Sequence, residues 1–457
     1  MTAATLERDE LARFADREQD RYESLLTELV ETPTVSSEPS HRGDIDAGVE
    51  LARRILKDFG ARVTVAKTKG NPVVHGIFPA PRRGAPAVTV YNHIDVQPAS
   101  RETEPWDTDP FRLVRKDGRY YGRGATDDKG PALCALFGAL AVREADVPIE
   151  IRFLWEFEEE IGSPNFEEGL RTLGREAATD SILVGDGLWL DSGHPASTSG
   201  LRGMQAFQFV LETGKAETHS GTTGGAARNP IGELMQLVSE IYDARTGRVK
   251  IPGFSDDVES PSRKELEEFR RSGFSVATFK KDFGFKSLRS KDALDVLKRI
   301  WALPTFEVHG VTGGYTGNGV KMIIPHRAEV KASCRLVPNQ KPKKVARLVR
   351  DFVKRKNPDV TVIVGGSASP FRGETTGPYA EALKRAMRFA FGKPAAFIRG
   401  GGSIGAVVTM KRVLQCPIAF LDVSLPEHGY HAPNEHFDWR QASGGIAAYA
   451  KYFEELA

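Results

Sequence analysis

Hydrophobic and polar residues recur with two different periods in the first 190 or so residues of the chain. Residues 43–59 have helical spacing, with apolar side chains on one side, and Gly60 follows as a helix-ending residue. An Ala-rich apolar run, PALCALFGALAVREA, predicts a buried crossover helix. Short runs rich in β-branched and aromatic residues predict strands, namely ARVTVA, PVVHGIF, PAVTVYN, IEIRFLWEF and SILVG. This alternation predicts an α/β sheet with helices on both faces.

The pattern changes between about residue 200 and residue 370. A strand (MQAFQFVLETG) and a helix (NPIGELMQLVSEIYDA) lead into a polar stretch, a helix pair and two strands (AEVKASCRLV and VTVIVGG). The charged region 255–300 predicts a solvated helical excursion. A helix (AEALKRAMRFAFG) and a strand (AFLDVS) then resume the first style. We predict a doubly wound mixed sheet built from residues 1–198 and 372–457, interrupted by an inserted α+β domain at residues 199–371.

Length, charge and cysteine content limit the class of protein. A chain of 457 residues is longer than one hydrophobic core usually grows, which predicts two domains. With 63 basic and 61 acidic side chains the net charge is +2, so we expect a small-molecule partner rather than nucleic acid or a membrane. Residues 1–30 have the charge pattern of an amphipathic helix and not of a secretory signal. The three cysteines are far apart and odd in number, and no apolar run is long enough to span a membrane. We predict a cytoplasmic protein without disulfides.

Polar side chains follow the predicted strands, which is where open α/β sheets place their active sites. After PAVTVYN come His93 and Asp95, and the alternation of a strand puts both side chains on the same side. An imidazole can bind a metal through one ring nitrogen while a carboxylate holds the other. By itself, a His-x-Asp pair is more often a structural or surface hydrogen bond.

The segment YGRGATDDKG (121–130) lies immediately before the Ala-rich helix. One explanation for Asp127 and Asp128 is helix capping, because aspartate is common at helix N-termini. Capping does not explain two adjacent aspartates among glycines, where close backbone approach is favoured. Both explanations stay open from the residues alone.

An acidic run, EFEEE (156–160), ends the apolar strand IEIRFLWEF. A solvated acidic turn is the simplest alternative. The run ends a strongly apolar strand, however, so its like charges would repel one another at a point where burial begins, and a bound cation would relieve that repulsion. In a hydrolytic site with two metals, one carboxylate binds metal while a neighbour takes a proton from the attacking water.

Two further strand ends add candidate ligands. Asp186 follows SILVG, and AFLDVS leads to EHGYHAPNE (427–435), which contains His431. An isolated histidine is more often structural. Together the five segments supply two histidines and several carboxylates, a ligand mix that suits zinc or manganese in oxygen-rich pairs.

With these segments assembled, the chain resembles the M20 family of metallopeptidases, in particular its bacterial dipeptidase and carnosinase-like branch. The resemblance spans nearly the whole chain, and its specificity lies in the order and spacing of the motifs. The motifs are YNHIDVQP (91–98), YGRGATDDKGP (121–131), EFEEEIGSPN (156–165), VGDGLWL (184–190), THSGTTGG (218–225), CRLVPNQ (334–340), GGGSI (400–404) and HGYHAPNE (428–435).

The resemblance implies a centre of two divalent metal ions, with Zn²⁺ expected first and Mn²⁺ as the alternative. Asp127 would bridge the ions. His93 and Asp186 would hold one ion, and Glu160 and His431 the other. It also implies a cis peptide bond after Asp127.

The resemblance further implies catalytic roles. Glu159 would be the general base, and Asp95 would orient His93. His219, in the HSG motif, resembles the histidine that reaches the active site of a neighbouring subunit and polarises the scissile carbonyl. A homodimer is therefore expected, with residues 199–371 as its lid and dimerisation domain.

Substrate-binding residues are implied in the same way. Arg335 matches the residue that binds the terminal carboxylate of the substrate, a task for which a bidentate guanidinium is well shaped. Taken alone, it would be a surface arginine on a strand. The backbone of Gly401, Gly402 and Ser403 would line the pocket.

Three hypotheses follow. The first is a dipeptidase acting on small peptides, because an Asp at position 186 goes with dipeptidases and aminopeptidases in this family. The second is an N-acyl amino acid amidohydrolase or a carboxypeptidase, because Gly400 stands where carnosinase-like enzymes carry an acidic residue. The third is a non-catalytic binding protein, which the loss of a ligand or of the base would reveal; this chain retains them all.

Overall fold

A six-stranded mixed sheet forms the centre of the larger part of the molecule. The computed structural model describes residues 6–457. The strand order is β1-β2-β6-β3-β7-β17. The β1-β2 and β2-β6 pairs are antiparallel, and the β6-β3, β3-β7 and β7-β17 pairs are parallel. The predicted doubly wound mixed sheet is thereby confirmed. The strands are β1 (Arg62–Ala66), β2 (Val73–Phe78), β6 (Glu150–Glu156), β3 (Ala87–His93), β7 (Ser181–Val184) and β17 (Ile418–Phe420).

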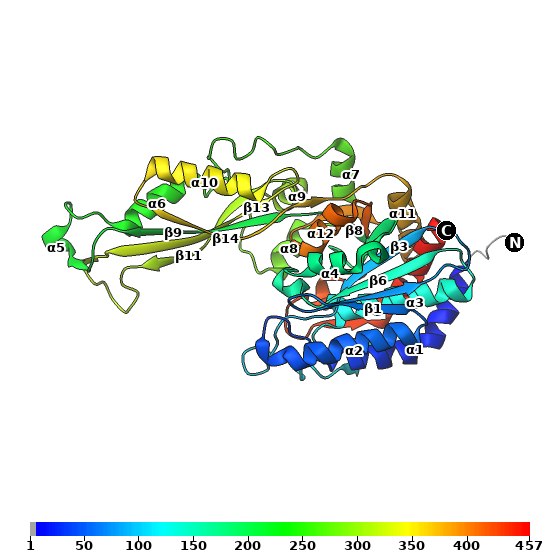
Figure 1. Ribbon diagram of the computed structural model, residues 1–457. Coiled ribbons are helices and arrows are strands. Elements are labelled where there is room, and N and C mark those ends of the chain that lie inside the picture. The colour runs from blue at the N-terminus through cyan, green and yellow to red at the C-terminus, as the bar shows by residue number, and fades with distance from the viewer. Residues whose placement is uncertain (1–5) are drawn as a thin grey trace.

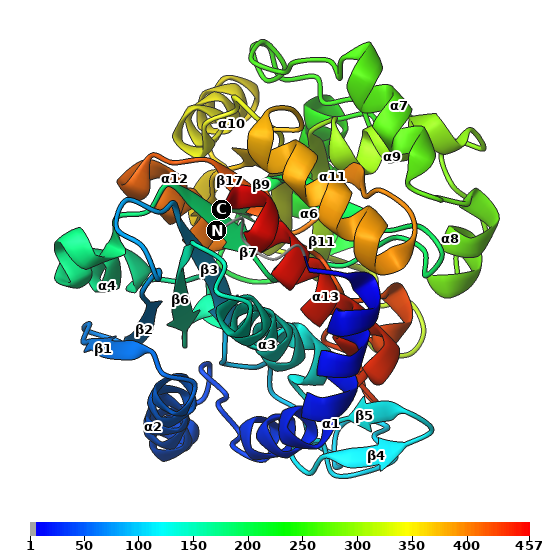
Figure 2. The same cartoon turned by 90° about the vertical axis from the view of Figure 1, so that its right-hand side faces the viewer.

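Helices cover both faces of this sheet. Figure 2 shows α4 and α12 on the opposite side of the strands from α3 and α13. The period-two alternation of β6 accounts for the two layers, since Phe153 and Trp155 join one hydrophobic cluster and Leu154 joins the other. The helices around the sheet are α1 (Arg8–Val30), α2 (Arg42–Asp58), α3 (Gly130–Glu144), α4 (Phe166–Leu173), α11 (Pro378–Phe391), α12 (Gly405–Leu414) and α13 (Trp439–Leu456).

Helix α3 is the crossover helix predicted from its Ala-rich sequence. Almost all of it is buried, and it packs closely against α13. Gly138 permits this approach, because a Cβ there would lie 2.6 Å from Cβ of Tyr449. The N-terminus of α3 lies directly after Asp127 and Asp128, so the packing of this helix fixes where the two aspartates lie.

The predicted N-terminal helix is present as α1, which begins at Arg8. Residues 1–5 of that prediction lie outside the described residues. The apolar side of α1, including Leu11, Leu25 and Leu26, is buried in the main core. No helix within residues 6–457 combines the length and apolarity that a membrane crossing requires.

A second, four-stranded antiparallel sheet extends away from the main body (Figure 1). Its order is β11-β13-β9-β14. Alternate residues of β9, including Phe207, Phe209 and Leu211, form a separate core with two helices that cover one face. The elements are β9 (Gly203–Glu212), α6 (Pro230–Ile241), β11 (Thr305–Gly313), β13 (Arg327–Leu336), α10 (Pro342–Lys356) and β14 (Thr361–Ala368).

The sequence did not reveal β11. This strand is an edge strand with mostly half-buried or exposed residues, and its register shifts at His309. Apolar periodicity is therefore weak there, although pairing with β13 holds the strand in the sheet.

The charged region 255–300 forms helices, but the prediction of a simply solvated excursion is wrong in one respect. Phe269, Leu297 and Trp301 are buried in the main core rather than in the core of the second sheet. Helices α7 and α9 each have one apolar face, but their many charged residues make this face hard to recognise in the sequence. Phe283 and Phe285, which follow α8, are exposed. The helices are α7 (Arg263–Arg271), α8 (Val276–Asp282) and α9 (Ala293–Trp301).

Small sheets complete the fold. One three-stranded sheet, β15-β8-β16, joins segments on both sides of residues 203–368, and another, β18-β5-β4, lies beside the segment before α3. The pair β10-β12 and helix α5 lie at the far end of the second sheet (Figure 1). The elements are β4 (Val114–Lys116), β5 (Arg119–Tyr121), β8 (Ala196–Leu201), β10 (Thr218–His219), α5 (Ser220–Thr223), β12 (Ile323–Ile324), β15 (Phe371–Arg372), β16 (Ala396–Gly400) and β18 (His436–Asp438).

Candidate metal centre

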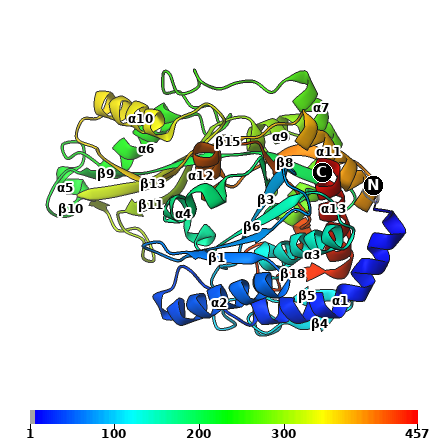
Figure 3. The same ribbon diagram turned by 45° about the vertical axis from the view of Figure 1, so that its right-hand side comes forward.

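The carboxyl ends of parallel strands bring the first candidate residues together. His93 is the last residue of β3 and pairs with Glu156, the last residue of β6. Asp186 lies two residues beyond β7, the other neighbour of β3. Figure 3 shows β3 and β6 side by side between the helix layers. The sheet topology thus directs side chains from separate loops to one edge.

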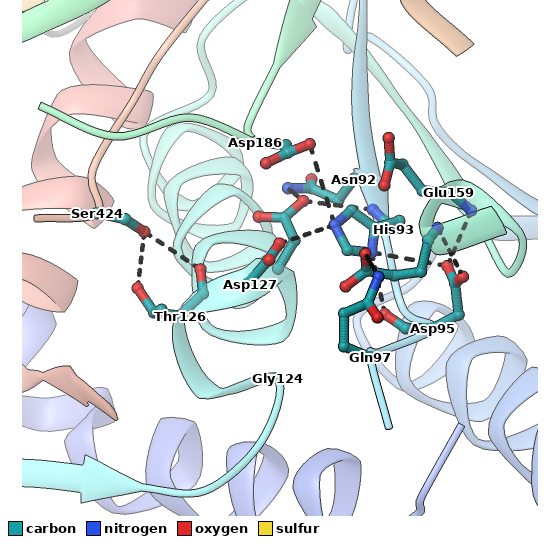
Figure 4. A network of polar contacts seen from close by, with 12 residues as sticks. Asn92, His93, Asp95, Gln97, Gly124, Thr126, Asp127, Glu159, Asp186 and Ser424 are labelled. Carbon is teal, nitrogen blue, oxygen red and sulfur yellow. Dashed lines mark hydrogen bonds and ion pairs between the residues drawn. The ribbon is translucent and has the colours of Figure 1, made fainter. Parts of the chain in front are cut away.

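His93, Asp127 and Asp186 form a buried triad. Nε2 of His93 lies 3.0 Å from Oδ1 of Asp127 and 4.0 Å from Oδ2 of Asp186. Figure 4 shows these three side chains facing one another. One potential ligand atom from each residue lies within 4.8 Å of the others.

A second triad contains Asp127, Glu160 and His431. Nε2 of His431 lies 3.0 Å from Oδ2 of Asp127 and 3.2 Å from Oε2 of Glu160. The backbone of His431 lies in the left-handed region, with φ 57°. Asp127 is therefore common to both triads and presents a different oxygen to each histidine.

The donor set fits two divalent cations. Each triad offers one imidazole and two carboxylates, a mixture that zinc and manganese both accept. Ligands about 2.0–2.2 Å from one ion lie close together, as the atoms of each triad do. The five predicted ligands thus meet in two groups of three that share one aspartate.

The electrostatics of the site also fit bound cations. Burial raises the pKa of Asp186 to about 7, and the charges of Asp127 and Glu160 add to the effect. Burial likewise raises the pKa of Glu159 well above its usual range. Burial acts in the same direction on Asp127, but hydrogen bonds from His431 and His93 hold its pKa below the ordinary value. Divalent cations would offset the cost of so many buried carboxylates.

Asp95 organises the site through its carboxylate and its main chain. Nδ1 of His93 donates to the main-chain carbonyl of Asp95 at 3.0 Å and lies 3.6 Å from its Oδ1. The carboxylate accepts hydrogen bonds from the N–H groups of Glu159 at 3.2 Å and Glu160 at 3.1 Å. Asp95 therefore fixes the tautomer of His93, leaving Nε2 for a metal, and also holds the turn that carries two acidic residues.

The segment that contains Asp127 has an irregular backbone. The peptide bond between Asp127 and Asp128 is cis, as the resemblance implies. Asp128 accepts a hydrogen bond from the amide of Asn92 at 2.9 Å. Lys129 points away from the carboxylates, because its Nζ donates to the carbonyl of Leu29 at 2.8 Å. Capping of α3 does not account for Asp127, since no side-chain cap is formed there.

Several residues of the site were missed in the sequence. Gln97 donates to Oε2 of Glu160 at 2.7 Å, and Ser36 donates to Oδ2 of Asp95 at 2.7 Å. Gln97 lies within the YNHIDVQP motif, so its position was a usable signal. Ser36 precedes the sheet, and no motif marks it.

The glycine-rich segment after β16 contacts the start of the second sheet. The N–H of Arg202 donates to the carbonyl of Gly402 at 3.1 Å, and the hydroxyl of Ser403 donates to the carbonyl of Arg202. The guanidinium of Arg202 donates to the carbonyl of Ile300 at 3.0 Å and to Thr305 at 3.2 Å. Gly401 and Gly402 are exposed. Arg202, which sequence reasoning missed, thus joins this loop to the second sheet.

Arg335 and His219 lie at opposite ends of the second sheet. Arg335 is near the end of β13, opposite Met204 and Thr305, close to the main body. His219 is exposed and lies beside α5 at the tip (Figure 1). Its Nδ1 accepts a hydrogen bond from Gly221 at 3.0 Å. The structure does not bring His219 to the two triads of its own chain.

Comparison with known proteins identifies the family. Residues 89–455 match the description of peptidase family M20/M25/M40. The chain is 30% identical to a Cys-Gly metallodipeptidase of Schizosaccharomyces pombe, over 98% of both chains. This chain belongs to the M20 peptidase family.

Two further relatives bear on this M20 metallopeptidase. Human Beta-Ala-His dipeptidase is 28% identical over 98% of this chain and 92% of its own. An M20 family metallo-carboxypeptidase from Sulfolobus solfataricus has a solved structure that superimposes with a TM-score of 0.84 at 28% identity, over 95% of this chain and 99% of the other. The M20 chain thus has the catalytic and lid architecture of its family, with divalent metal ions as the family cofactor.

Proposed function

We propose that this M20 peptidase hydrolyses the peptide bond of dipeptides and short peptides. The observation that carries the proposal is the pair of triads that share Asp127. A pair of divalent ions, when bound, lowers the pKa of a water between them and polarises a carbonyl. The names of the relatives from Schizosaccharomyces pombe and human support a dipeptide substrate.

Glu159 is the proposed general base. Its N–H donates to Asp95 at 3.2 Å, and its carboxylate lies beside His93 (Figure 4). Burial raises the pKa of this carboxyl, which makes it a better proton acceptor than an exposed glutamate once cations favour the ionised form. Glu159 would take a proton from the attacking water and deliver it to the leaving amine.

We assign substrate binding to the end of the second sheet that lies next to the main body. Arg335 would bind the terminal carboxylate of the peptide through its guanidinium. Gly401, Gly402 and Ser403 would line the pocket with backbone groups. Gly405, which follows this segment, supports the placement, because a Cβ there would lie 2.6 Å from the carbonyl of Gly162, close to the Glu159–Ile161 turn.

A homodimer with His219 contributed in trans completes the proposed site. The location of α5 supports this arrangement, because His219 is its N-cap residue and the helix lies at the end of the second sheet away from the main body (Figure 1). We propose residues 1–198 and 372–457 as the catalytic domain and residues 199–371 as the lid and dimerisation domain. Although α7 and α9 fall within the last range, they pack against the catalytic domain.

The surface of the lid offers a contact for that dimer. A hollow of about 580 Å³ lies between α6 and the edge strand β11. Met235 and Val311 on its rim are 64% and 58% exposed. An apolar hollow beside an edge strand supports pairing of two copies through the same surface.

We propose Zn²⁺ as the metal, with Mn²⁺ as the alternative, and the cytoplasm as the location. The mixed nitrogen and oxygen ligands support either ion. Cys134, Cys334 and Cys416 are buried and free, which supports a reducing compartment.

The proposal is tested by hydrolysis of unblocked dipeptides. Chain stripped of metal is reconstituted with Zn²⁺ or Mn²⁺ and assayed against a panel of free dipeptides, with the stripped chain as the control. We expect turnover only after reconstitution. Uniform inactivity of the reconstituted chain across the panel would overturn the assignment.

A second candidate is a carboxypeptidase or N-acyl amino acid amidohydrolase. Gly400 supplies no acidic group for a free amino terminus, and a Cβ at Gly401 or Gly402 would meet nothing within 4 Å, so this end of the pocket has room. The solved carboxypeptidase of the family supports the same possibility. Faster turnover of N-acylated than of free dipeptides would favour it.

A further inference from the structure

Glu435 holds the chain that leads into Asp127. Its side chain is fully buried. Oε1 accepts hydrogen bonds from the N–H groups of Thr126 at 3.0 Å and Asp127 at 3.1 Å. Oε2 accepts from the N–H of Gly124 at 3.1 Å and from Nη1 of Arg123 at 2.7 Å. One carboxylate therefore accepts hydrogen bonds from four of the five residues 123–127.

The main chain of Glu435 strengthens this connection. Its carbonyl accepts a hydrogen bond from the N–H of Gly122 at 2.9 Å. Arg123 is itself held, because its N–H donates to the carbonyl of Pro110 at 2.7 Å and its guanidinium lies over the ring of Trp106 at 5.2 Å. The segment before Asp127 is thus attached to Glu435 through both main chain and side chain.

Glu435 also lies on the loop that carries His431. Between them, Asn434 has φ 60° and accepts a hydrogen bond from the N–H of Asp107 at 2.9 Å, which anchors the loop. His431 and Asp127 come from segments far apart in the sequence, yet their side chains are 3.0 Å apart. Glu435 joins these two segments directly beside the metal ligands.

We propose that Glu435 is a positioning residue for Asp127, fixing its carboxylate between His93 and His431 and so setting the affinity for both metal ions. The inference rests on the proposed metal centre. Asp127 belongs to both triads, so a displacement of its main chain changes both sets of ligands at once. Outer partners of metal ligands commonly change affinity by about 10–100-fold when they are lost.

A merely structural role would have a different consequence. Loss of a buried ion pair destabilises a protein wherever the pair lies. A structural role therefore predicts a lower melting temperature with normal metal affinity in the molecules that stay folded. A positioning role predicts weaker metal binding in those folded molecules.

Three variants separate the two roles. Glu435→Gln keeps one oxygen for the N–H groups of Thr126 and Asp127 but places an amide against those of Arg123 and Gly124. Glu435→Ala removes all four contacts. Glu265→Gln is the matched control, because Glu265 accepts from the buried Arg399 at 2.5 Å at a site between α7 and β16.

Metal-stripped full-length chains are titrated with Zn²⁺ and Mn²⁺ by calorimetry with a competing chelator, at a temperature where circular dichroism shows each variant folded. We expect both binding steps to weaken about 10-fold or more in Glu435→Gln, further in Glu435→Ala, and not in Glu265→Gln. If Glu435→Ala does not fold, the comparison of the two glutamine variants decides.

Wild-type affinity in folded Glu435→Gln, with a melting temperature lowered as in Glu265→Gln, would overturn the role of Glu435. That failure is distinct from failure of the proposed function. If the wild-type chain itself bound no ions, the proposed metal centre would be wrong, and so would the role of Glu435.

Discussion

His431 and His93 face opposite oxygens of the Asp127 carboxylate, each with Nε2 at 3.0 Å. One side chain therefore connects two ligand groups that come from different loops of the sheet. Cations bound on each side would be held by a shared negative charge and would in turn neutralise it. The same relationship explains why activity and stability should depend on metal together.

Removal of metal should abolish turnover and lower stability. Exhaustive dialysis against a chelator leaves the buried carboxylates of Asp127, Asp186 and Glu160 uncompensated. Each ion present at 100 times its dissociation constant contributes about 2.7 kcal/mol to the folded state. Thermal unfolding and dipeptide hydrolysis, measured before and after return of Zn²⁺ or Mn²⁺, check both effects. An unchanged rate in chelated protein shown to be metal-free would contradict the prediction.

Replacement of the proposed base should separate catalysis from metal binding. Glu159→Gln should lower kcat by about 10²–10⁴-fold, because a general base contributes that much, while metal content stays at the wild-type level. Glu158→Gln is the neighbouring control. Glu158 accepts hydrogen bonds from Asn71 at 2.7 Å and from Asn165 at 3.1 Å, so its replacement should lower stability rather than kcat. Substantial turnover by Glu159→Gln would remove the assignment.

The sheet and the metal ligands were accessible from sequence for physical reasons. Buried strands such as β3 and β6 have strong apolar and β-branched patterns, and parallel strands direct their ends to one edge. His93 and Asp186 could therefore be expected at strand ends from the pattern, whereas their pairing at one ion came from the resemblance. The grouping of ligands around Asp127 came from the resemblance and not from spacing.

Other features depended on tertiary contacts that local sequence does not encode. β11 is held by pairing with β13, although its own pattern is weak. The apolar faces of α7 and α9 are hidden among charges, so their packing on the main body was missed. Arg202 acts through backbone carbonyls, which have no sequence signature.

Loss of the guanidinium at Arg335 should raise KM only for substrates that have a free carboxyl terminus. Arg335→Lys retains the charge but not the bidentate geometry, so KM for free dipeptides should rise about 10-fold or more. A dipeptide with an amidated C-terminus provides the control, and its KM should differ little between the two proteins. Equal effects on both substrates would show that Arg335 does not bind the carboxylate.

His75 should make stability depend on pH below neutrality. Burial, helped by the charge of Arg152, lowers its pKa from 6.5 to about 4, and neither ring nitrogen has a hydrogen-bond partner among residues 6–457. The unfolded chain binds this proton near pH 6.5 but the folded chain only near 4. Its contribution is therefore complete above pH 6.5 and is lost as the pH falls towards 4, by about 1.4 kcal/mol per unit and about 3 kcal/mol in all.

Denaturant unfolding of wild type and His75→Leu across pH 4–7 measures this effect. With decreasing pH, the free energy of unfolding should fall less steeply in the variant than in wild type. Between pH 6.5 and 4 the two slopes should differ by about 1.4 kcal/mol per pH unit, which corresponds to one proton. Parallel curves for the two proteins would contradict the prediction.

Mixing of subunits tests whether His219 acts in trans. His219→Ala and Glu159→Ala should each be nearly inactive as homodimers. In a mixed dimer, the site with an intact Glu159 receives the intact His219 of its partner, so one of its two sites works. Random exchange of equal amounts should restore about a quarter of wild-type activity. If His219 acted within its own chain, or had no catalytic role, mixing would restore nothing or His219→Ala alone would be active.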